Sequence, residues 1–359
     1  MSTEGTVESE LPRRAPAGFT SHTFTTPHGA TLSVRVWAAS PSPASPAPFV
    51  TYTHGGGWLA GNHFAPLAWM DAGFRQRGYH VVSHNYRLGP QASVDVQLQD
   101  CLDAVAWCRA SLPNIVGRDK VDVNRFVVSG ESGGGHLATL MAHHLSPPPR
   151  AVIDAYGIVD PAACWPIFRP ITLPANPPTW TGAFGEQELH DFFADRDPAN
   201  VITDALWWDE ETRLPESALS EGWATEFKYT RRIRLQAELH RIRVDVTGNP
   251  EAALRSVRVG SFHEERFEDE EALKKFVRSI SPGPLLEGKT WYPPTAFLHG
   301  TEDLAAPIEQ SRVMAAKLRE MGVEVLESYE EGEEHVFDQK YTVSYFLIKS
   351  ERVRECYDS

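Results

Sequence analysis

Cysteine, basic residues and long hydrophobic runs are all scarce in this sequence of 359 residues. The four cysteines show no Cys-x-x-Cys spacing and are too few for a disulfide framework, so neither a zinc site nor a disulfide staple is expected. Lys and Arg number 34 against 48 Asp and Glu, and because the net charge of -14 repels phosphates, we expect no nucleic-acid partner. No run approaches the roughly 18 consecutive apolar residues of a membrane helix, so we expect no membrane insertion.

The N-terminal residues also lack the apolar stretch of a secretory signal, and the C-terminal Tyr-Asp-Ser matches no simple retention or peroxisomal address. We therefore expect a cytoplasmic protein. The composition, 42% hydrophobic and 23% charged, is that of an ordinary globular protein. Its length suffices for one large domain or two ordinary ones.

Short apolar segments alternate with helical patterns along most of the chain. Segments 21–26 and 31–37 alternate apolar and polar residues around a Pro-His-Gly turn, which predicts an antiparallel hairpin. Continuously apolar or β-branched runs follow and predict buried strands: Phe49–Thr53, His80–Ser83, Arg125–Ser129, Val152–Ala155, Thr295–Leu298 and Val323–Tyr329. Helices are predicted between and after them: Val94–Arg109, Gly134–Leu145, Ile308–Met321 and Val343–Tyr357. This order predicts an α/β fold, with a mostly parallel sheet covered by helices on both faces.

One interruption breaks this alternation, between Asp160 and Trp291. About 130 residues separate two buried strands there, far more than an ordinary connection. The segment holds six of the ten tryptophans, and helical patterns lie at 186–193, 221–242 and 269–279. We predict an N-terminal arm at 1–18, a catalytic core at 19–160 and 292–359, and an inserted cap at 161–291.

Two glycine-rich motifs follow buried strands. Gly130-Glu131-Ser132-Gly133-Gly134 lies between a strand and a helix, the context of a nucleophile elbow, where glycines relieve crowding around a strained serine. His54-Gly55-Gly56-Gly57-Trp58 follows another strand, and its consecutive glycines allow backbone N–H groups to converge on a developing negative charge. Either motif alone is compatible with a simple tight turn. Together they predict a serine nucleophile with an oxyanion hole.

These motifs resemble those of the hormone-sensitive-lipase-like branch of the α/β-hydrolase superfamily, a family of serine carboxylesterases. Asn85–Pro90 is similar to the Tyr-Arg-Leu-x-Pro stretch of that family, and Leu98-Gln99-Asp100 with Trp107 matches the following helix. The resemblance covers 19–160 and 293–337. It implies an eight-stranded α/β-hydrolase fold with a large helical cap inserted before the strand that leads to the catalytic acid.

A serine nucleophile needs a histidine base and an acid that orients the histidine. In the chain order serine, acid, histidine, the His-Gly-x-x-Asp turn after a buried strand resembles the acid turn of the family and assigns Asp303. Glu302 is the adjacent rival and is expected to be a solvated loop residue. His335 follows the last strand in a His-x-Phe loop similar to that of the family and is the expected base.

The resemblance also assigns the oxyanion donors. Gly56 and Gly57 are expected to donate from the His54–Trp58 motif, and Gly133 is expected to donate from the position after the nucleophile. Glu131 and Gly133 depart from the Asp and Ala usual in this branch, but neither change removes a catalytic group. Trp58, which ends the same His54–Trp58 motif, is expected to contact substrate. The motif histidines His54, His136 and His299 are expected to brace loops.

One motif points to a different class of protein. Residues 283–290 satisfy the P-loop pattern Gly-x-x-x-x-Gly-Lys-Thr. Pro284 lacks an N–H group, however, and Trp291-Tyr292-Pro293-Pro294 cannot begin the required helix, so we expect no nucleotide site.

We therefore expect a serine hydrolase that cleaves carboxylic esters of a small or medium-sized molecule, without metal or organic cofactor. Three alternatives stay open. The same residues could serve lactone opening, thioester release or cyclisation in biosynthesis, or amide cleavage as in the similar kynurenine formamidases. A non-enzymatic ligand receptor on this fold is the third, although such receptors typically lose the histidine. The sequence leaves the oligomeric state open.

Overall fold

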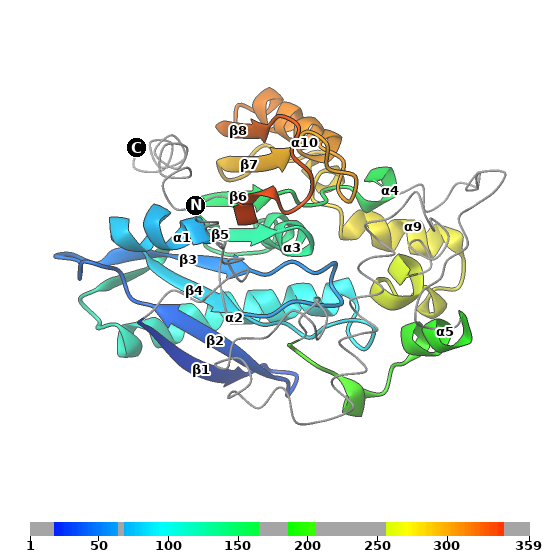
Figure 1. Cartoon of the computed structure of the whole chain (residues 1–359), viewed down its shortest axis with the longest axis horizontal. Coiled ribbons are helices and arrows are strands. Elements are labelled where there is room, and N and C mark those ends of the chain that lie inside the picture. Colours follow the sequence, from blue (N-terminus) through cyan, green and yellow to red (C-terminus); the bar gives the residue numbers. More distant parts are fainter. Residues whose placement is uncertain (1–17, 64–67, 165–185, 205–255, 341–359) are drawn as a thin grey trace, which may run out of the picture.

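The computed structural model describes residues 18–63, 68–164, 186–204 and 256–340. Eight strands form a single sheet in the order β1-β2-β4-β3-β5-β6-β7-β8 (Figure 1). β2 is antiparallel to both of its neighbours, and every other pair is parallel. The strands are β1 Phe19–Thr25, β2 Thr31–Trp37, β3 Ala47–Thr53, β4 His80–His84, β5 Val121–Glu131, β6 Ala151–Ala155, β7 Thr295–Gly300 and β8 Val325–Glu330. The eight-stranded, mostly parallel sheet confirms the predicted fold class.

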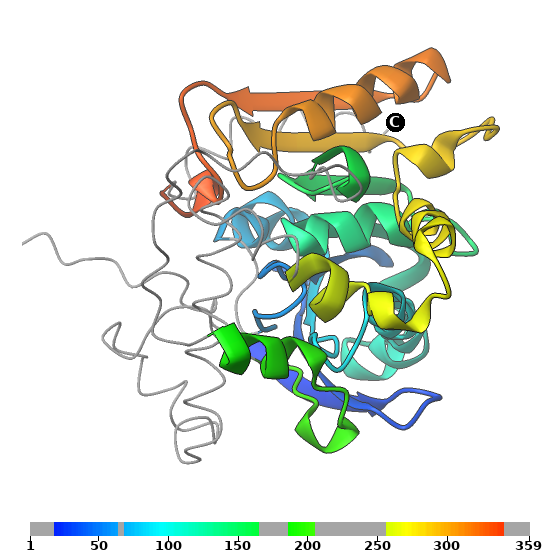
Figure 2. The ribbon, with the colours of Figure 1, turned by 90° about the vertical axis from the view of Figure 1, so that its right-hand side faces the viewer.

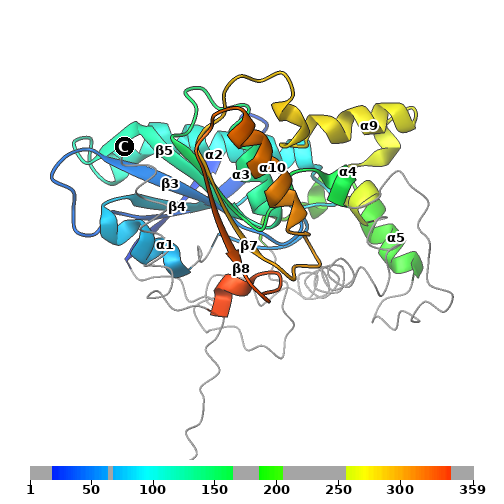
Figure 3. The same cartoon turned by 90° about the horizontal axis from the view of Figure 1, so that it is seen from above.

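Helices cover both faces of this sheet. The helices of the described residues are α1 Ala68–Gly73, α2 Val94–Ile115, α3 Gly133–Met141, α4 Pro161–Cys164, α5 Glu186–Ala194, α9 Glu270–Ser279 and α10 Glu309–Glu320. α1 lies on one face, whereas α2, α3 and α10 lie on the other (Figure 3). Within the described residues, no helix combines the length and the apolar character needed to cross a bilayer.

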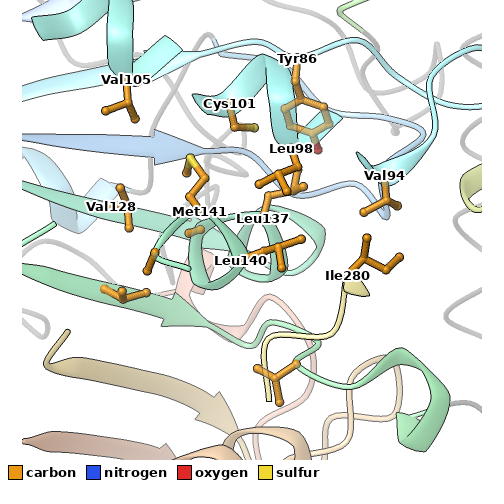
Figure 4. Packing of buried hydrophobic residues seen from close by; sticks show 14 of the residues in the cluster. Tyr86, Val94, Leu98, Cys101, Val105, Val128, Leu137, Leu140, Met141 and Ile280 are labelled. Carbon is orange, nitrogen blue, oxygen red and sulfur yellow. The ribbon is translucent and has the colours of Figure 1, made fainter. Parts of the chain in front are cut away.

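The core follows from the alternation of side chains along the buried strands. Phe49 and Val128 point toward α2 and α3, whereas their neighbours Val50 and Val127 point toward α1. Figure 4 shows the buried side chains between the sheet and the helices α2 and α3, where Cys101 of α2 and Leu137 of α3 pack among strand side chains. Because both faces are covered, the parallel strands are apolar on both sides, which explains the continuous hydrophobic runs.

Two helices differ in length from the sequence expectation. α2 continues to Ile115, beyond the predicted end at Arg109, and includes Pro113. The extra turn persists because Leu112 is fully buried and Ile115 packs on the core, and this packing outweighs one lost backbone hydrogen bond. α3 ends at Met141 instead of Leu145, where the chain tightens into short turns.

The described parts of the insertion between β6 and β7 are α4, α5, α9 and short helical turns. α4, α5 and α9 gather on one side of the molecule in Figure 1, and Figure 3 agrees. Arg196, which follows α5, connects the insertion with the core by donating to the carbonyl of Pro90 (2.9 Å), and it also donates to the carbonyl of Val259 within the insertion (2.6 Å). α9 begins as predicted, with Asp269 as its N-cap.

The remaining predicted helices, 221–242 and 343–357, lie outside the described residues, as do 1–17 of the expected arm. The boundaries 161–291 for a cap stay a prediction.

The corner between β5 and α3 is closely packed against β3. A Cβ atom added to Gly134 would lie 2.1 Å from the carbonyl oxygen of Thr53. No side chain fits at this distance without moving the backbone, so glycine is required where α3 crosses the end of β3.

We expect Gly134→Ala to lower the free energy of unfolding by about 3 kcal/mol, because the methyl group forces α3 away from β3. Gly78→Ala is the matched control, since an added Cβ there meets nothing within 4 Å among the described residues. An alanine in the left-handed backbone conformation of Gly78 should lower the free energy of unfolding by only about 1 kcal/mol. Urea unfolding followed by tryptophan fluorescence measures both, and equal losses would contradict the close-packing argument.

A second feature of the sheet is a buried carboxylate on β6. Asp154 is fully buried, and its Oδ1 accepts a hydrogen bond from the Gly157 N–H at 2.7 Å. Its Oδ2 has no hydrogen-bond partner among the described residues. Burial raises the pKa of Asp154 to about 6, against the opposing influence of His299.

Asp154 should therefore make stability depend on pH. Because its folded-state pKa lies above the unfolded value, its stabilising contribution is complete below about pH 4 and is lost as the pH rises through about 6. Between pH 4.5 and 7.5 we expect the wild type to lose about 1–2 kcal/mol more stability than Asp154→Asn. Urea unfolding at the two pH values measures this difference, with the exposed Asp119→Asn as control. Parallel pH dependence of wild type and Asp154→Asn would show the prediction to be wrong.

Candidate active site

The register of the parallel strands brings four loops to one edge of the sheet. Thr53 of β3 pairs with Gly130 of β5, and Glu131 pairs with Ala155 of β6. β7 and β8 also end together, and Figure 2 shows them side by side with their arrowheads at the same end. The carboxyl edge of a parallel sheet is where such folds bind ligands. Ser132, Asp303 and His335, the expected catalytic triad, each follow one of these strand ends, and so do the glycines expected to form the oxyanion hole.

Ser132 lies at the sharp turn between β5 and α3. Its backbone has φ 50° and ψ −121°, a strained conformation for a non-glycine residue. The turn is held because the Ser132 N–H donates to the carbonyl of Ala155 at 2.8 Å, and the Ser132 carbonyl accepts from His136 at 3.0 Å. α3 starts at the next residue, so the positive end of its dipole lies beside the serine. This is the geometry of a nucleophile elbow.

Ser132, His335 and Asp303 form one hydrogen-bonded chain. The Oγ of Ser132 lies 2.9 Å from Nε2 of His335, and Nδ1 of His335 lies 2.6 Å from Oδ2 of Asp303. These three residues are separated by up to 203 positions in the sequence and meet only in the fold. The distances suit proton transfer from a serine to an imidazole whose second nitrogen is fixed by a carboxylate.

The carboxylate of Asp303 is held in its ionised form. Burial opposes ionisation, but hydrogen bonds from His299 and His335 outweigh it and keep the pKa of Asp303 well below its usual range. Oδ1 accepts from the N–H groups of Ala305 (2.9 Å) and Ala306 (2.8 Å), which leaves Oδ2 for the histidines. The carboxylate therefore stays charged at neutral pH. The rival Glu302 is exposed to solvent.

His299 is a second contact of this acid. Its Nε2 lies 3.2 Å from Oδ2 of Asp303 and 2.6 Å from the carbonyl of Ala306, while its Nδ1 lies 2.7 Å from the hydroxyl of Ser311. His299 thus braces the acid turn, as its place in the motif predicted. Its direct contact with the acid was not foreseen, although a spacing of four residues within a turn is a signal for it.

The glycine loop after β3 lies against the nucleophile. Gly56 and Gly57 have φ of 104° and 58°, in the left-handed region that glycine adopts at little cost. A Cβ added to Gly133 would lie 3.4 Å from the Cα of Gly57, so the space between the two backbones is no larger than one methyl group needs. The residues expected to donate to an oxyanion are therefore neighbours in space, beside the start of α3.

Trp58 has an unexpected environment. Its side chain is fully buried, and its indole N–H donates to Nδ1 of His136 at 3.2 Å. Because this nitrogen accepts, Nε2 of His136 carries the proton and donates to the carbonyl of Ile280 at 2.7 Å. Burial lowers the pKa of His136 to about 4, so the ring is neutral. The indole thus braces the glycine loop against α3 and the chain after α9, and contact between Trp58 and substrate stays a prediction.

Within the described parts of the chain, no cluster of three or more His, Cys, Asp or Glu side chains is arranged to hold a metal ion. The chemistry that the arrangement supports is nucleophilic attack by a serine with general-base assistance.

Comparison with known proteins agrees with this fold. The family model described as the alpha/beta hydrolase fold matches residues 50–196, and that of the prolyl oligopeptidase family matches 256–348. The non-reducing polyketide synthase Preu6 of Preussia isomera is 26% identical over 82% of this chain and 12% of its own length. The ethyl acetate hydrolase of Pseudomonas putida is 33% identical over 39% of this chain and 45% of its own length.

These curated relatives are matched over less than half of their own length. A solved structure of an esterase from Pyrobaculum calidifontis shares the fold, with a TM-score of 0.55 at 16% identity over 95% of this chain and 87% of that one. The family models, the sheet order and the motifs at the strand ends agree with one another. The chain has the α/β-hydrolase fold, and the family models that match it describe hydrolases of this kind.

Proposed function

We propose that this protein is a serine hydrolase that cleaves carboxylic esters of small or medium-sized organic molecules through an acyl-enzyme. The observation that carries the proposal is the chain of hydrogen bonds from Ser132 through His335 to Asp303, at 2.9 and 2.6 Å. A serine hydroxyl is a weak nucleophile until a base removes its proton, and His335 is the base within reach.

The reaction divides between these three residues. Ser132 Oγ attacks the ester carbonyl while Nε2 of His335 takes its proton, and Asp303 stabilises the imidazolium that forms. His335 then returns the proton to the departing alkoxide, which leaves as the alcohol. Water enters, gives a proton to the same imidazole and attacks the acyl group, and the acid departs as Ser132 recovers its proton.

The oxyanion of each tetrahedral intermediate needs donors beside Ser132. The backbone N–H groups of Gly56, Gly57 and Gly133 fill this role in our proposal. Their support is the close approach of the glycine loop to Gly133, together with the helix dipole of α3. No metal or organic cofactor takes part in the proposed mechanism.

Relatives of known chemistry support the reaction class. The Pseudomonas putida relative is named for ethyl acetate hydrolysis, and a second relative, 34% identical over 31% of this chain, is the rabbit arylacetamide deacetylase. Both names describe acyl transfer from an ester or amide to water, which passes through a tetrahedral intermediate.

We expect the purified protein to hydrolyse p-nitrophenyl esters in the series from acetate to decanoate, and Ser132→Ala to lower kcat/KM about 10⁴-fold or more because the nucleophile is lost. Ser129→Ala is the matched control. It removes a buried hydroxyl three residues earlier in β5, bonded to the Thr51 carbonyl, and should stay within about threefold of wild type, since it removes one hydrogen bond outside the triad. Release of p-nitrophenolate at 400 nm measures the rates. Equal activity of wild type and Ser132→Ala would overturn the proposal.

A biosynthetic release reaction is the second candidate. The polyketide synthase match extends over 82% of this chain, further than the match to the ethyl acetate hydrolase. In that relative the matching segment is 12% of a much longer protein. A thioester is attacked by the same serine, and its thiolate leaves more readily than an alkoxide, so the proposed residues suit both substrates.

An N-acetylcysteamine thioester and the ethyl ester of the same acyl group separate the two candidates. Thioester release would be favoured if kcat/KM for the thioester exceeded that for the oxygen ester by more than about 100-fold. A ratio of this size is more than one small contact in a pocket supplies. Comparable values would favour the esterase. Liquid chromatography with mass detection follows both acids and also detects lactone products of cyclisation.

A further inference from the structure

A buried polar cluster lies behind the triad and takes no part in the mechanism above. It contains Glu131, the residue before Ser132, and Asp338, three residues after His335, each 3% exposed. Tyr156, which follows β6 and is fully buried, contacts both. The Tyr156 hydroxyl lies 2.9 Å from Oε2 of Glu131 and 2.6 Å from Oδ1 of Asp338. One hydroxyl thus connects the neighbour of the nucleophile with the loop of the base.

The second carboxylate oxygens of Glu131 and Asp338 also accept hydrogen bonds. Tyr52 of β3 donates its hydroxyl to Oε1 of Glu131 at 2.6 Å, and the Gly55 N–H donates to the same oxygen at 3.3 Å. Trp69 of α1 donates its indole N–H to Oδ2 of Asp338 at 3.2 Å. Each carboxylate has a polar partner at both of its oxygens, so turning either one breaks a buried hydrogen bond, and the cluster is rigid.

Tyr156 also contacts the base directly. Its ring lies 5.0 Å from the imidazole of His335 between centroids, with the planes inclined at 67°. Phe337 packs on the same tyrosine ring at 5.9 Å. The intervening Val336 has φ 55°, and this sharp bend allows His335 and Phe337 to face the same ring. The position of the imidazole therefore depends on the position of the tyrosine.

The backbone of Tyr156 is itself strained. Its φ is 46°, in the left-handed region, which is energetically unfavourable for a bulky residue. The conformation is held by the Tyr156 N–H, which donates to the Leu298 carbonyl of β7 at 2.7 Å, and by the two carboxylates at the hydroxyl. Strain maintained by its surroundings beside a reactive histidine points to a functional role.

We propose that Tyr156 is a positioning residue for His335, which holds the imidazole in line with Ser132 by its ring contact and its bond to Asp338. The inference rests on the proposed function, since it concerns the same base. During the reaction His335 must accept a proton from Ser132 and deliver it to the leaving group, and a displacement of about 1 Å can lower the rate about 100-fold. A rigid tyrosine limits that displacement.

Tyr156→Phe tests the proposal, because it keeps the ring and removes the bridging hydroxyl. We expect kcat for p-nitrophenyl acetate to fall about tenfold or more, KM to change less than twofold, and the pH profile of kcat to shift. Tyr292→Phe is the matched control. It removes another buried tyrosine hydroxyl, bonded to the Thr139 carbonyl at 2.6 Å, and should lower the melting temperature while kcat stays within twofold.

Asp338→Asn provides a second variant that keeps the shape of the cluster and weakens its bonds to Tyr156 and Trp69. We expect it to lower kcat in the same direction as Tyr156→Phe. If both variants melt below wild type but keep kcat and the pH profile, Tyr156 is structural only and the proposal is wrong.

Proton NMR separates this inference from the proposed function. The proton between Nδ1 of His335 and Asp303 should resonate far downfield in the wild type and exchange faster in Tyr156→Phe than in Tyr292→Phe. This signal does not require turnover. An inactive wild type with that difference would overturn the esterase proposal alone, whereas an active wild type with no difference between the variants would overturn the positioning role alone.

Discussion

The close approach of α3 to the end of β3 is the constraint on which the site depends. At this corner the chain turns from a buried strand into a helix with no space for a side chain at Gly134, and Ser132 is left in a strained conformation above the sheet. The same approach places the glycine loop after β3 against Gly133. The proposed nucleophile, the glycines proposed as oxyanion donors and a helix dipole are therefore brought together by one packing contact, before any charged residue is considered.

The remaining groups are arranged around that corner by the sheet. Parallel strands end at the same edge, so the loops after β7 and β8 bring Asp303 and His335 to the serine. Each reactive group is then fixed by a second layer of contacts. His299 and two backbone N–H groups hold Asp303, Tyr156 contacts His335, and His136 connects Trp58 with the insertion. Such supporting contacts keep reacting atoms within the narrow range that catalysis needs.

This arrangement explains how relatives with different names share one framework. Ester, thioester and amide cleavage all pass through a tetrahedral intermediate with a negative oxygen, so one serine, one base and one set of donors can serve them all. We expect the choice among substrates to depend on other parts of the chain. In this chain the insertion between β6 and β7 contacts the core through Arg196 and the carbonyl of Ile280, and loops of this kind carry specificity.

The sequence by itself determined the fold class, the strand order along the chain and the identity of the residues that meet at the site. It could do so because glycine requirements and buried-strand patterns are local properties, as at Gly130–Gly134 and His54–Trp58, and because the turns at Asp303 and His335 resemble those of a known family. Only the tertiary structure decided what surrounds those residues. The burial of Trp58 against His136 and the bridge from Tyr156 to two carboxylates both join residues of different elements. No spacing along the chain encodes such contacts, because they arise when strands and helices pack side by side.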